Sequence, residues 1–263
     1  MRICRFSHGE EVSFGVLDNL DDQGELTENS IIAILRGHPF GELDPDGRVI
    51  AASSVKLLAP ILPSKIIGIG KNYAEHAVEM NSVLPTEPLM FLKPNTSVIG
   101  PNEFIVLPQQ SSIIHHEAEL AIVIGRFCKD VPRGRVDEVV LGYTCANDVS
   151  ARDVQQMDGQ WTRAKGFDTF CPLGPWIETD LDPTNLTISA YVGSQQRQSG
   201  NTKDLVFSVV DLVSYVSHQM TLLPGDVILT GTPAGIGPII AGDEIEIAIE
   251  GIGSLVNTVK DAQ

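Results

Sequence analysis

The sequence has few cysteines and no long apolar run. Its four cysteines, Cys4, Cys128, Cys145 and Cys171, are widely spaced and form no CxxC pair. This spacing argues against a zinc site or a disulfide framework and predicts reduced, structural cysteines. No stretch approaches about 18 uninterrupted apolar residues, and the first residues lack the apolar segment of a secretory signal. We therefore expect a cytoplasmic protein with no membrane partner.

Basic residues are also scarce. The chain has 18 Lys and Arg against 34 Asp and Glu, which gives a net charge of -16. Such a chain repels a phosphate backbone over long range, so nucleic acid is a poor partner. An anionic ligand would need local attraction, from a metal ion or from a few well-placed basic side chains. The 43% hydrophobic content is typical of a globular protein with a sizeable core.

The length of 263 residues suits one large domain with a small appendage. Residues 1–60 contain short apolar stretches separated by turn signals such as Asp44-Pro45-Asp46-Gly47, which predict a small β-rich N-terminal domain. Residues 61–263 form the second domain. Its predicted strands, which are rich in β-branched residues and bounded by Gly or Pro, are Lys65–Gly70, Glu117–Gly125, Val139–Ala146, Leu186–Val192, Val227–Thr230 and Glu244–Ile249.

Helices are fewer than strands in this pattern. A short helix is predicted from Tyr73 to Met80. Two further helices are predicted from capping boxes, one opening at Ser150 with Asp153 three residues on, and one opening at Ser208 with Asp211 three residues on. We thus expect a mainly β fold with some α.

Three acidic residues carry the clearest chemical signal. Glu117 and Glu119 are two apart in a predicted strand, so their side chains share one face. Two carboxylates about 4 Å apart repel by about 4 kcal/mol at an effective dielectric constant of about 20. They are therefore either exposed to solvent, protonated or bridged by a cation. Asp148, just before a predicted helix, is a candidate third ligand, and an all-carboxylate set suits Mg²⁺ or Mn²⁺ rather than zinc.

Two pairs on predicted helices are further candidates. His76 and Glu79 are three apart, and a carboxylate at that distance can orient an imidazole as a general base. Arg152 and Gln155 are also three apart and would present an anion donor beside an amide donor. In isolation, such spacings more often mark a surface pair and a solvated helix face, so the context must decide.

Two other segments could bind an anion or could be structural turns. The segment Trp161–Asp168 places Arg163 and Lys165 beside aromatic residues, and Leu229–Gly237 is a glycine-rich loop after a predicted strand. The loop lacks the Lys-Ser/Thr ending of a Walker motif. Gly68-Ile69-Gly70 likewise meets Tyr73 where a dinucleotide-binding motif needs a third glycine, so a nucleotide cofactor is not expected.

Taken in order, these segments resemble the fumarylacetoacetate hydrolase family, in particular its shorter acylpyruvate hydrolase and oxaloacetate decarboxylase members. The resemblance runs from about Lys65 to Val259. It is carried by Gly70-Lys71-Asn72-Tyr73 to His76, Phe91-Leu92-Lys93-Pro94, His116-Glu117-Ala118-Glu119-Leu120, Asp148–Gln155, Lys165-Gly166-Phe167-Asp168 and Leu229–Gly235. It implies a mixed β-sandwich roll for the catalytic domain, and a homodimer.

The resemblance also implies roles for individual residues. Glu117, Glu119 and Asp148 would hold one Mg²⁺ or Mn²⁺, and His76 with Glu79 would form the catalytic dyad. Lys165 would belong to the catalytic set, and together with Arg152, Gln155 and Thr232 it would contact the carboxylate and oxo groups of the substrate.

The expected function is cleavage of the C3–C4 bond of a small anionic 2-oxo acid, either by hydrolysis of an acylpyruvate or fumarylpyruvate or by decarboxylation of oxaloacetate. The bound cation would stabilise the enolate that forms when the bond breaks. Two alternatives remain open. One is an isomerase of the 2-hydroxyhepta-2,4-diene-1,7-dioate type in aromatic catabolism, and the other is a non-catalytic, metal-stabilised ligand-binding protein.

Overall fold

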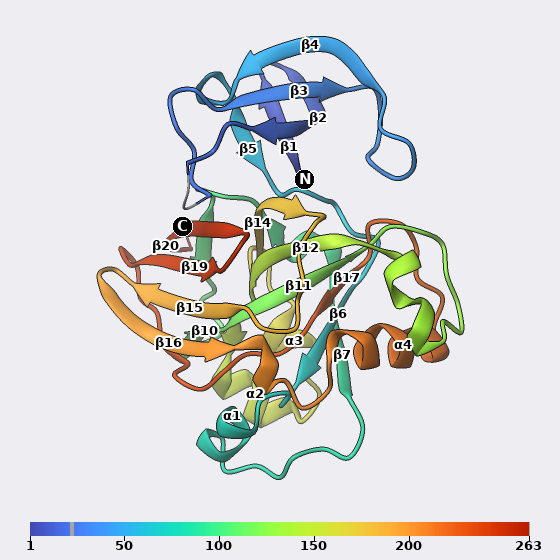
Figure 1. Cartoon of the computed structure of the whole chain (residues 1–263). Helices are drawn as coiled ribbons and strands as arrows, with labels where there is room; N and C mark the ends of the chain where they lie inside the picture. The colour runs from blue at the N-terminus through green and yellow to red at the C-terminus, as the bar shows by residue number, and fades with distance from the viewer. Residues whose placement is uncertain (22–23, 263) are drawn as a thin grey trace.

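The computed structural model describes residues 1–21 and 24–262 and is mainly β (Figure 1). Helices are short and few in the described residues. The α-helices are α1 Ala74–Glu79, α2 Arg152–Asp158, α3 Thr162–Lys165 and α4 Val209–Gln219, and the 3-10 helices are η1 Ala52–Ser54, η2 Asn95–Ser97, η3 Arg133–Glu138 and η4 Thr202–Asp204.

The largest sheet has 12 strands and runs through both parts of the chain. Its main path is β4-β3-β2-β1-β14-β12-β11-β17-β6-β7, with β5 beside β1 and β8 beside β14. The strands are β1 Arg2–His8, β2 Glu11–Asp18, β3 Ile31–Leu35, β4 Pro45–Ala51, β5 Lys56–Leu58, β6 Ile66–Gly70, β7 Leu89–Lys93, β8 Val98–Ile99, β11 Ala118–Ile124, β12 Val140–Asn147, β14 Cys171–Glu178 and β17 Val227–Leu229.

Two smaller sheets complete the roll. A 5-stranded sheet has the order β16-β15-β19-β20-β9, and a 3-stranded sheet has the order β13-β10-β18. Their strands are β9 Phe104–Leu107, β10 Ile114–His116, β13 Ser150–Ala151, β15 Thr187–Val192, β16 Gln195–Asn201, β18 Gly237–Pro238, β19 Glu244–Ile249 and β20 Gly253–Asp261.

The N-terminal strands form a separate β-rich module at the top of Figure 1, as the turn signals predicted. It joins the rest of the chain by antiparallel pairing of β1 with β14, in which Arg2 lies opposite Glu178. The carboxylate of Glu178 forms ion pairs with the amino group of Met1 at 2.5 Å and with Nε of Arg2 at 3.2 Å. This charged contact fastens the module to the core.

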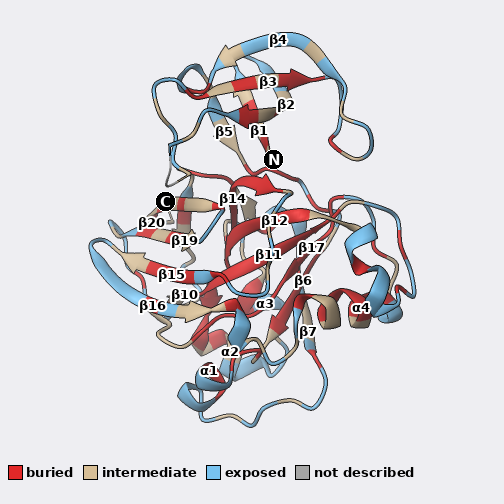
Figure 2. Cartoon of the chain, viewed as in Figure 1, coloured by how far each residue is buried: buried red, intermediate tan, exposed pale blue. Residues whose placement is uncertain are grey.

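The core lies around the central strands of the large sheet. Every residue of β11 and of β14 is buried, as the continuous red ribbons of Figure 2 show. Long apolar runs without alternation are what a strand covered on both faces requires. The strands predicted from the sequence are present, and their bounds lie within one or two residues of those expected. All four cysteines are free and buried in this core, as predicted.

One predicted helix start is correct and one is wrong. Ser208 caps α4 in a full capping box with Asp211. Ser150 instead lies in β13 opposite His115, and α2 begins at Arg152 with no side-chain cap. Asp153 accepts hydrogen bonds from Ser111 and Ser112, so the expected partner of Ser150 is already used by a preceding loop.

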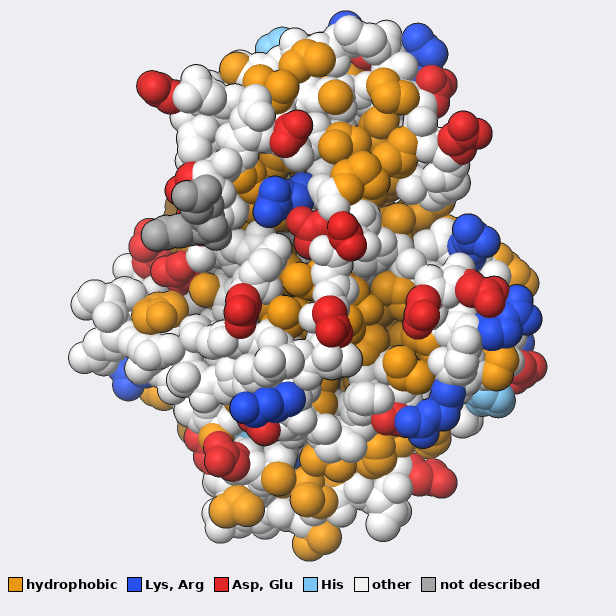
Figure 3. Space-filling view, viewed as in Figure 1, with side chains coloured by type: hydrophobic (Ala, Val, Ile, Leu, Met, Phe, Trp, Pro, Cys, Tyr) orange, Lys and Arg blue, Asp and Glu red, His pale blue; other side chains and the backbone are white. Residues whose placement is uncertain are grey.

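The surface agrees with the acidic composition. Figure 3 shows acidic side chains scattered over one face, among apolar side chains that extend from the N-terminal module onto the core. Dispersed apolar atoms on a surface are usual for folded proteins. In the described residues, no helix is long and apolar enough to cross a membrane.

Candidate active site

Three carboxylates meet at the end of the central strands. Glu119 is in β11, Glu117 immediately precedes that strand, and Asp148 follows β12. Ala118 pairs with Asn147 across β11 and β12, and the backbone N–H of Asp148 donates to the carbonyl of Glu117 at 2.9 Å. This pairing brings carboxylate oxygens of all three residues within 4.8 Å of one another, and all three residues are buried. The alternative of an exposed acidic strand face is therefore wrong.

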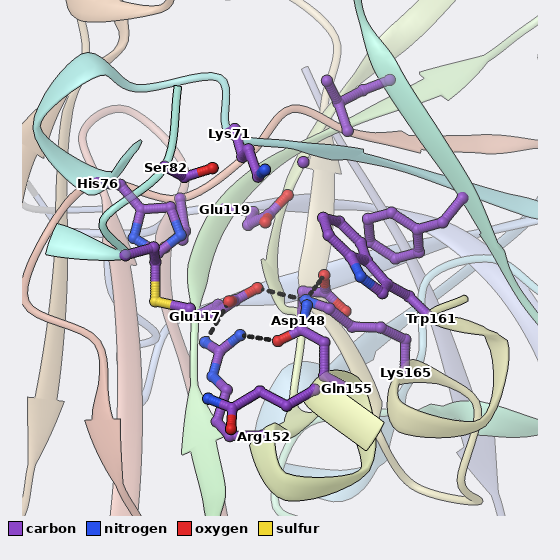
Figure 4. Close-up of a pocket in the computed structure, with 16 residues that line it drawn as sticks. Lys71, His76, Ser82, Glu117, Glu119, Asp148, Arg152, Gln155, Trp161 and Lys165 are labelled. Atoms are coloured by element: carbon purple, nitrogen blue, oxygen red, sulfur yellow. Dashed lines mark hydrogen bonds and ion pairs between the residues drawn. The ribbon is translucent and has the colours of Figure 1, made fainter. Parts of the chain in front are cut away.

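Basic side chains contact two of the three carboxylates. Nζ of Lys165 donates to Oε2 of Glu117 and to Oδ2 of Asp148, both at 2.6 Å, and Arg152 forms an ion pair with Glu117 (Figure 4). Nζ of Lys93 donates to the other oxygen of Asp148, Oδ1, at 2.5 Å. The positive charge thus lies around Glu117 and Asp148.

Glu119 is less well compensated. Its Oε2 accepts a hydrogen bond from the backbone N–H of Gly231 at 2.7 Å, and it makes no ion pair with any described residue. Burial, followed by the neighbouring charges of Asp148 and Glu117, raises the pKa of Glu119 well above its ordinary value. Glu119 therefore lacks a cationic partner of its own, and its ionised form is disfavoured unless a cation binds beside it.

The neighbouring charges favour the ionised forms of Glu117 and Lys165. Burial opposes ionisation of Glu117, but Arg152 and Lys165 outweigh it and lower the pKa of Glu117. Burial likewise opposes the charge on Lys165, but Asp148 and Glu117 raise its pKa above the ordinary value. Glu117 and Lys165 are therefore charged at neutral pH.

The triad fits a hard divalent cation. It consists only of carboxylate oxygens, which Mg²⁺ and Mn²⁺ prefer, and Glu119 is the member whose ionised form the protein does not stabilise by an ion pair. Among residues 1–21 and 24–262, it is the one cluster of three or more acidic, histidine or cysteine side chains whose ligand atoms come this close. An ion there would relieve the repulsion that otherwise forces a proton onto Glu119.

A histidine of α1 lines the same cavity as this cluster, and a glutamate of the same helix contacts the histidine. Nδ1 of His76 lies 3.0 Å from Oε2 of Glu79, and the second oxygen of Glu79 accepts a hydrogen bond from the N–H of Gly235, also at 3.0 Å. His76 is buried and lines the same cavity as the triad. The glycine-rich loop thus orients Glu79, and Glu79 in turn orients the imidazole.

The pair on α2 also faces the cavity. Arg152 donates from Nη1 to Oε1 of Gln155 at 2.9 Å, while its Nη2 contacts Glu117. The Gln155 oxygen is therefore occupied and its amide group remains as a donor. Both residues line the cavity, so this face of α2 is not simply solvated.

Thr232 lies in the glycine-rich loop and also lines the cavity. Its Oγ1 accepts a hydrogen bond from Nε2 of Gln198 at 2.7 Å, and the same amide nitrogen donates to the carbonyl of Pro233 at 2.7 Å. Oε1 of Gln198 accepts from the N–H of Ala118 at 2.8 Å. Gln198 therefore holds the loop against the start of β11.

All nine residues expected at the site line one cavity of about 210 Å³ or support it directly. His76, Glu117, Glu119, Asp148, Arg152, Gln155, Lys165 and Thr232 line it, and Glu79 contacts His76 from behind. Lys93 and Gln198 were missed as contributors to the site. Lys93 belongs to the segment Phe91-Leu92-Lys93-Pro94, which carries part of the family resemblance. The residues around it in the sequence do not indicate that its side chain is buried against Asp148.

A β roll with a buried carboxylate triad, a His–Glu pair and basic residues around one small cavity forms a small-molecule site whose carboxylates could hold a metal ion. The family model for the fumarylacetoacetate (FAA) hydrolase C-terminal domain matches residues 65–260, and the Rv2993c-like N-terminal model matches residues 1–60. The chain belongs to the fumarylacetoacetate hydrolase family.

Relatives cover nearly the whole chain. Protein Rv2993c of Mycobacterium tuberculosis is 52% identical over 263 residues, which cover 98% of both proteins. The mitochondrial oxaloacetate tautomerase Fahd2a of Rattus norvegicus is 44% identical over 223 residues, which cover 80% of this chain and 71% of the relative.

Solved structures share the complete fold. The crystal structure of 5-carboxymethyl-2-hydroxymuconate delta-isomerase from Mycobacterium smegmatis has a TM-score of 0.93 and 51% identity, with 100% of both chains covered. Maleylpyruvate hydrolase from Sphingobium, solved with manganese(II) and pyruvate, has a TM-score of 0.80 and 32% identity, also over 100% of both chains. The family thus includes hydrolase, isomerase and tautomerase activities.

Proposed function

We propose that this protein is a divalent-metal-dependent enzyme that cleaves the C3–C4 bond of small 2-oxo acids by hydrolysis. One observation carries the proposal. The cavity combines a buried carboxylate triad, in which Glu119 lacks an ion-pair partner, with a buried histidine that Glu79 orients. The first suits a cation, and the second suits activation of water.

The proposed ligands of Mg²⁺ or Mn²⁺ are Glu117, Glu119 and Asp148. The manganese and pyruvate in the solved maleylpyruvate hydrolase support both the kind of ion and the kind of product. A cation held by these oxygens would act as a Lewis acid for the charge that develops on the 2-oxo oxygen of the substrate.

The basic and amide side chains would bind the same end of the substrate. Arg152 can donate to a carboxylate in a bidentate manner, and the free amide of Gln155 offers a second donor. Lys165 and Thr232 would contact the remaining carboxylate and oxo oxygens. The chain has a net charge of -16, and these donors would supply the local attraction that an anionic ligand needs.

His76 would act as the general base. It would take a proton from a water molecule whose oxygen forms a bond to C4, while Glu79 stabilises the imidazolium. The C3–C4 electron pair then moves towards the 2-oxo group, and the fragment containing C4 leaves as a carboxylic acid. Return of the proton from His76 to C3 gives pyruvate and balances the reaction.

The second candidate is an isomerase of unsaturated 2-oxo diacids, and the names of two similar solved structures favour it. That reaction needs the same stabilised charge on the 2-oxo oxygen. The enolate is then protonated at a different carbon atom, and no water molecule attacks. Decarboxylation of oxaloacetate also needs no water.

A substrate panel separates these reactions. Oxaloacetate, acetylpyruvate and an unsaturated 2-oxo diacid are assayed with Mg²⁺ for pyruvate, for CO₂ and for deuterium exchange at C3. Hydrolysis predicts pyruvate without CO₂ from acetylpyruvate. Release of CO₂ from oxaloacetate without acetylpyruvate turnover would favour a decarboxylase, and exchange without pyruvate would favour the isomerase. Metal-dependent thermal shifts with oxalate but no turnover would indicate the ligand-binding protein.

Variants then test the assigned roles. His76→Gln should lower hydrolysis by roughly 10²- to 10⁴-fold, and Glu119→Gln should lose metal-dependent turnover. His8→Gln and Glu10→Gln change an exposed histidine and an exposed glutamate in the N-terminal module and serve as matched controls. Full activity of Glu119→Gln after chelation would refute the role of the metal.

A further inference from the structure

Lys71 is a basic residue of the cavity that the proposed chemistry does not use. It directly follows β6, lines the same cavity as the triad and is only half-buried. Figure 4 shows its side chain on the Glu119 side of the cluster, across the carboxylates from Arg152. Lys71 therefore stands at the opposite end of the cavity from the donors assigned to the substrate's 1-carboxylate.

The backbone holds Lys71 in an unusual conformation. Its φ of 59° lies in the left-handed region, which costs a residue with a side chain free energy. The next residue, Asn72, is buried and clamps this point of the chain. Its amide donates to the carbonyls of Phe207 at 3.0 Å and Thr230 at 2.7 Å, and its oxygen accepts from the N–H of Phe207 at 2.8 Å. The direction in which the Lys71 side chain leaves the backbone is thus set by the fold.

The charge of Lys71 is not neutralised by the protein. Arg152 and Lys165, the other basic residues that line the cavity, form ion pairs with the triad. Within the described ranges, the Lys71 side chain makes no hydrogen bond and no ion pair. A cationic group beside a buried site, with no internal partner, is available to an anionic ligand.

The surroundings of Lys71 suit the far end of a short acid. Trp161 packs over Gly70, where a Cβ atom would lie 2.5 Å from the indole ring, and it stacks edge-on with Phe91 at 5.4 Å between ring centroids. These rings form an apolar wall for the carbon chain. Ser82 lines the same end and offers a hydroxyl group. A volume of about 210 Å³ admits only a small molecule.

We infer that Lys71 is a specificity residue that binds a second carboxylate at the distal end of the substrate. This inference rests on the proposed function and narrows its substrate class to dianionic 2-oxo acids, in which one carboxylate lies beside Arg152 and the other beside Lys71. Lys71 contributes to binding rather than to bond cleavage.

The test compares two acylpyruvates that differ in distal charge. Succinylpyruvate ends in a carboxylate, and pentanoylpyruvate has an uncharged chain. In Lys71→Asn, the ratio of kcat/KM for succinylpyruvate over pentanoylpyruvate should fall by roughly 10- to 100-fold, mainly through KM, because one charge-assisted hydrogen bond is lost. Lys71→Arg should keep most of the ratio. Asn tolerates the left-handed conformation, so the variant is expected to fold.

Lys203→Gln removes an exposed lysine outside the cavity and should leave the ratio unchanged. An equal loss on both substrates in Lys71→Asn would overturn the inference, because it would mean that Lys71 only neutralises the triad. An unchanged ratio would overturn it as well.

Calorimetric binding of the same two compounds to the Mn²⁺-loaded protein gives a second readout that needs no turnover. If the wild type hydrolyses neither compound, the proposed hydrolysis fails. The dissociation constant of succinylpyruvate divided by that of pentanoylpyruvate then still decides the role of Lys71: a tenfold or larger rise of this ratio in Lys71→Asn supports the role, and equal ratios in the two proteins refute it.

Discussion

Replacing Glu119 by glutamine should stabilise the metal-free protein and remove most of the stabilisation that a divalent cation gives to the wild type. Glutamine has nearly the same shape and can still accept the hydrogen bond from Gly231. It removes the charge that faces Asp148 and Glu117. Without metal this relieves repulsion, and with metal it removes a proposed ligand.

The magnitude follows from the geometry. Carboxylate oxygens within 4.8 Å repel by at least about 3.5 kcal/mol per pair at an effective dielectric constant of about 20. Glu119 faces two such groups, and Lys165 offsets part of the repulsion. A net gain of roughly 2–4 kcal/mol in the free energy of unfolding is therefore expected for the metal-free variant once Glu119 of the wild type is ionised.

The pH dependence has a definite sign. Because the folded-state pKa of Glu119 is raised, the folded wild type binds a proton that the unfolded chain has released. Its stability relative to the variant is highest at low pH and is lost as the pH rises towards the raised pKa, by up to about 1.4 kcal/mol per pH unit. The advantage of Glu119→Gln should therefore grow from pH 5.5 to pH 8.5.

The assay is urea unfolding in EDTA at several pH values, repeated with Mn²⁺ in excess. At 100 times the dissociation constant, Mn²⁺ should stabilise the wild type by about 2.7 kcal/mol and leave the variant nearly unchanged. Lower stability of Glu119→Gln at every pH in EDTA would refute the reasoning, since the three carboxylates would then not repel one another. Equal stabilisation of both proteins by Mn²⁺ would show that Glu119 is not a ligand.

Three further substitutions test the supports of the site. Lys93→Met leaves Asp148 buried with one ion-pair partner fewer and should cost about 3–5 kcal/mol in urea unfolding, whereas a loss below about 1 kcal/mol would contradict a buried pair. Gln198→Leu frees Thr232 and should raise KM more than it lowers kcat; steady-state kinetics with no change in KM would count against this. Asn72→Ala leaves buried backbone groups unpaired and should lower thermal stability by about 2–4 kcal/mol, and an unchanged melting temperature would argue against that network.

The fold was largely predictable from local pattern. β6 is a continuous apolar run, and β11 is one from Leu120 to Ile124, which is the local signature of a strand covered on both faces. The helix start at Ser208 was predictable because its capping partner is three residues away. The start at Ser150 was not, because strand pairing with His115 and hydrogen bonds from a distant loop override the local pattern.

The site was predictable where its residues stand close in sequence or match a family segment. Glu117 and Glu119 share a strand face, and His76 and Glu79 share a helix face. The contacts of Lys93 with Asp148 and of Gln198 with the glycine-rich loop join residues 55 and 34–35 positions apart. No local pattern reports that a lysine or a glutamine will be buried against such a partner.

Anomalous diffraction from crystals grown with Mn²⁺ and oxalate tests the metal site most directly. We predict one manganese peak bonded to Glu117, Glu119 and Asp148, with oxalate completing its coordination and contacting Arg152. Absence of a peak between these carboxylates, with Lys165 still bridging Glu117 and Asp148, would contradict the proposed metal-dependent chemistry.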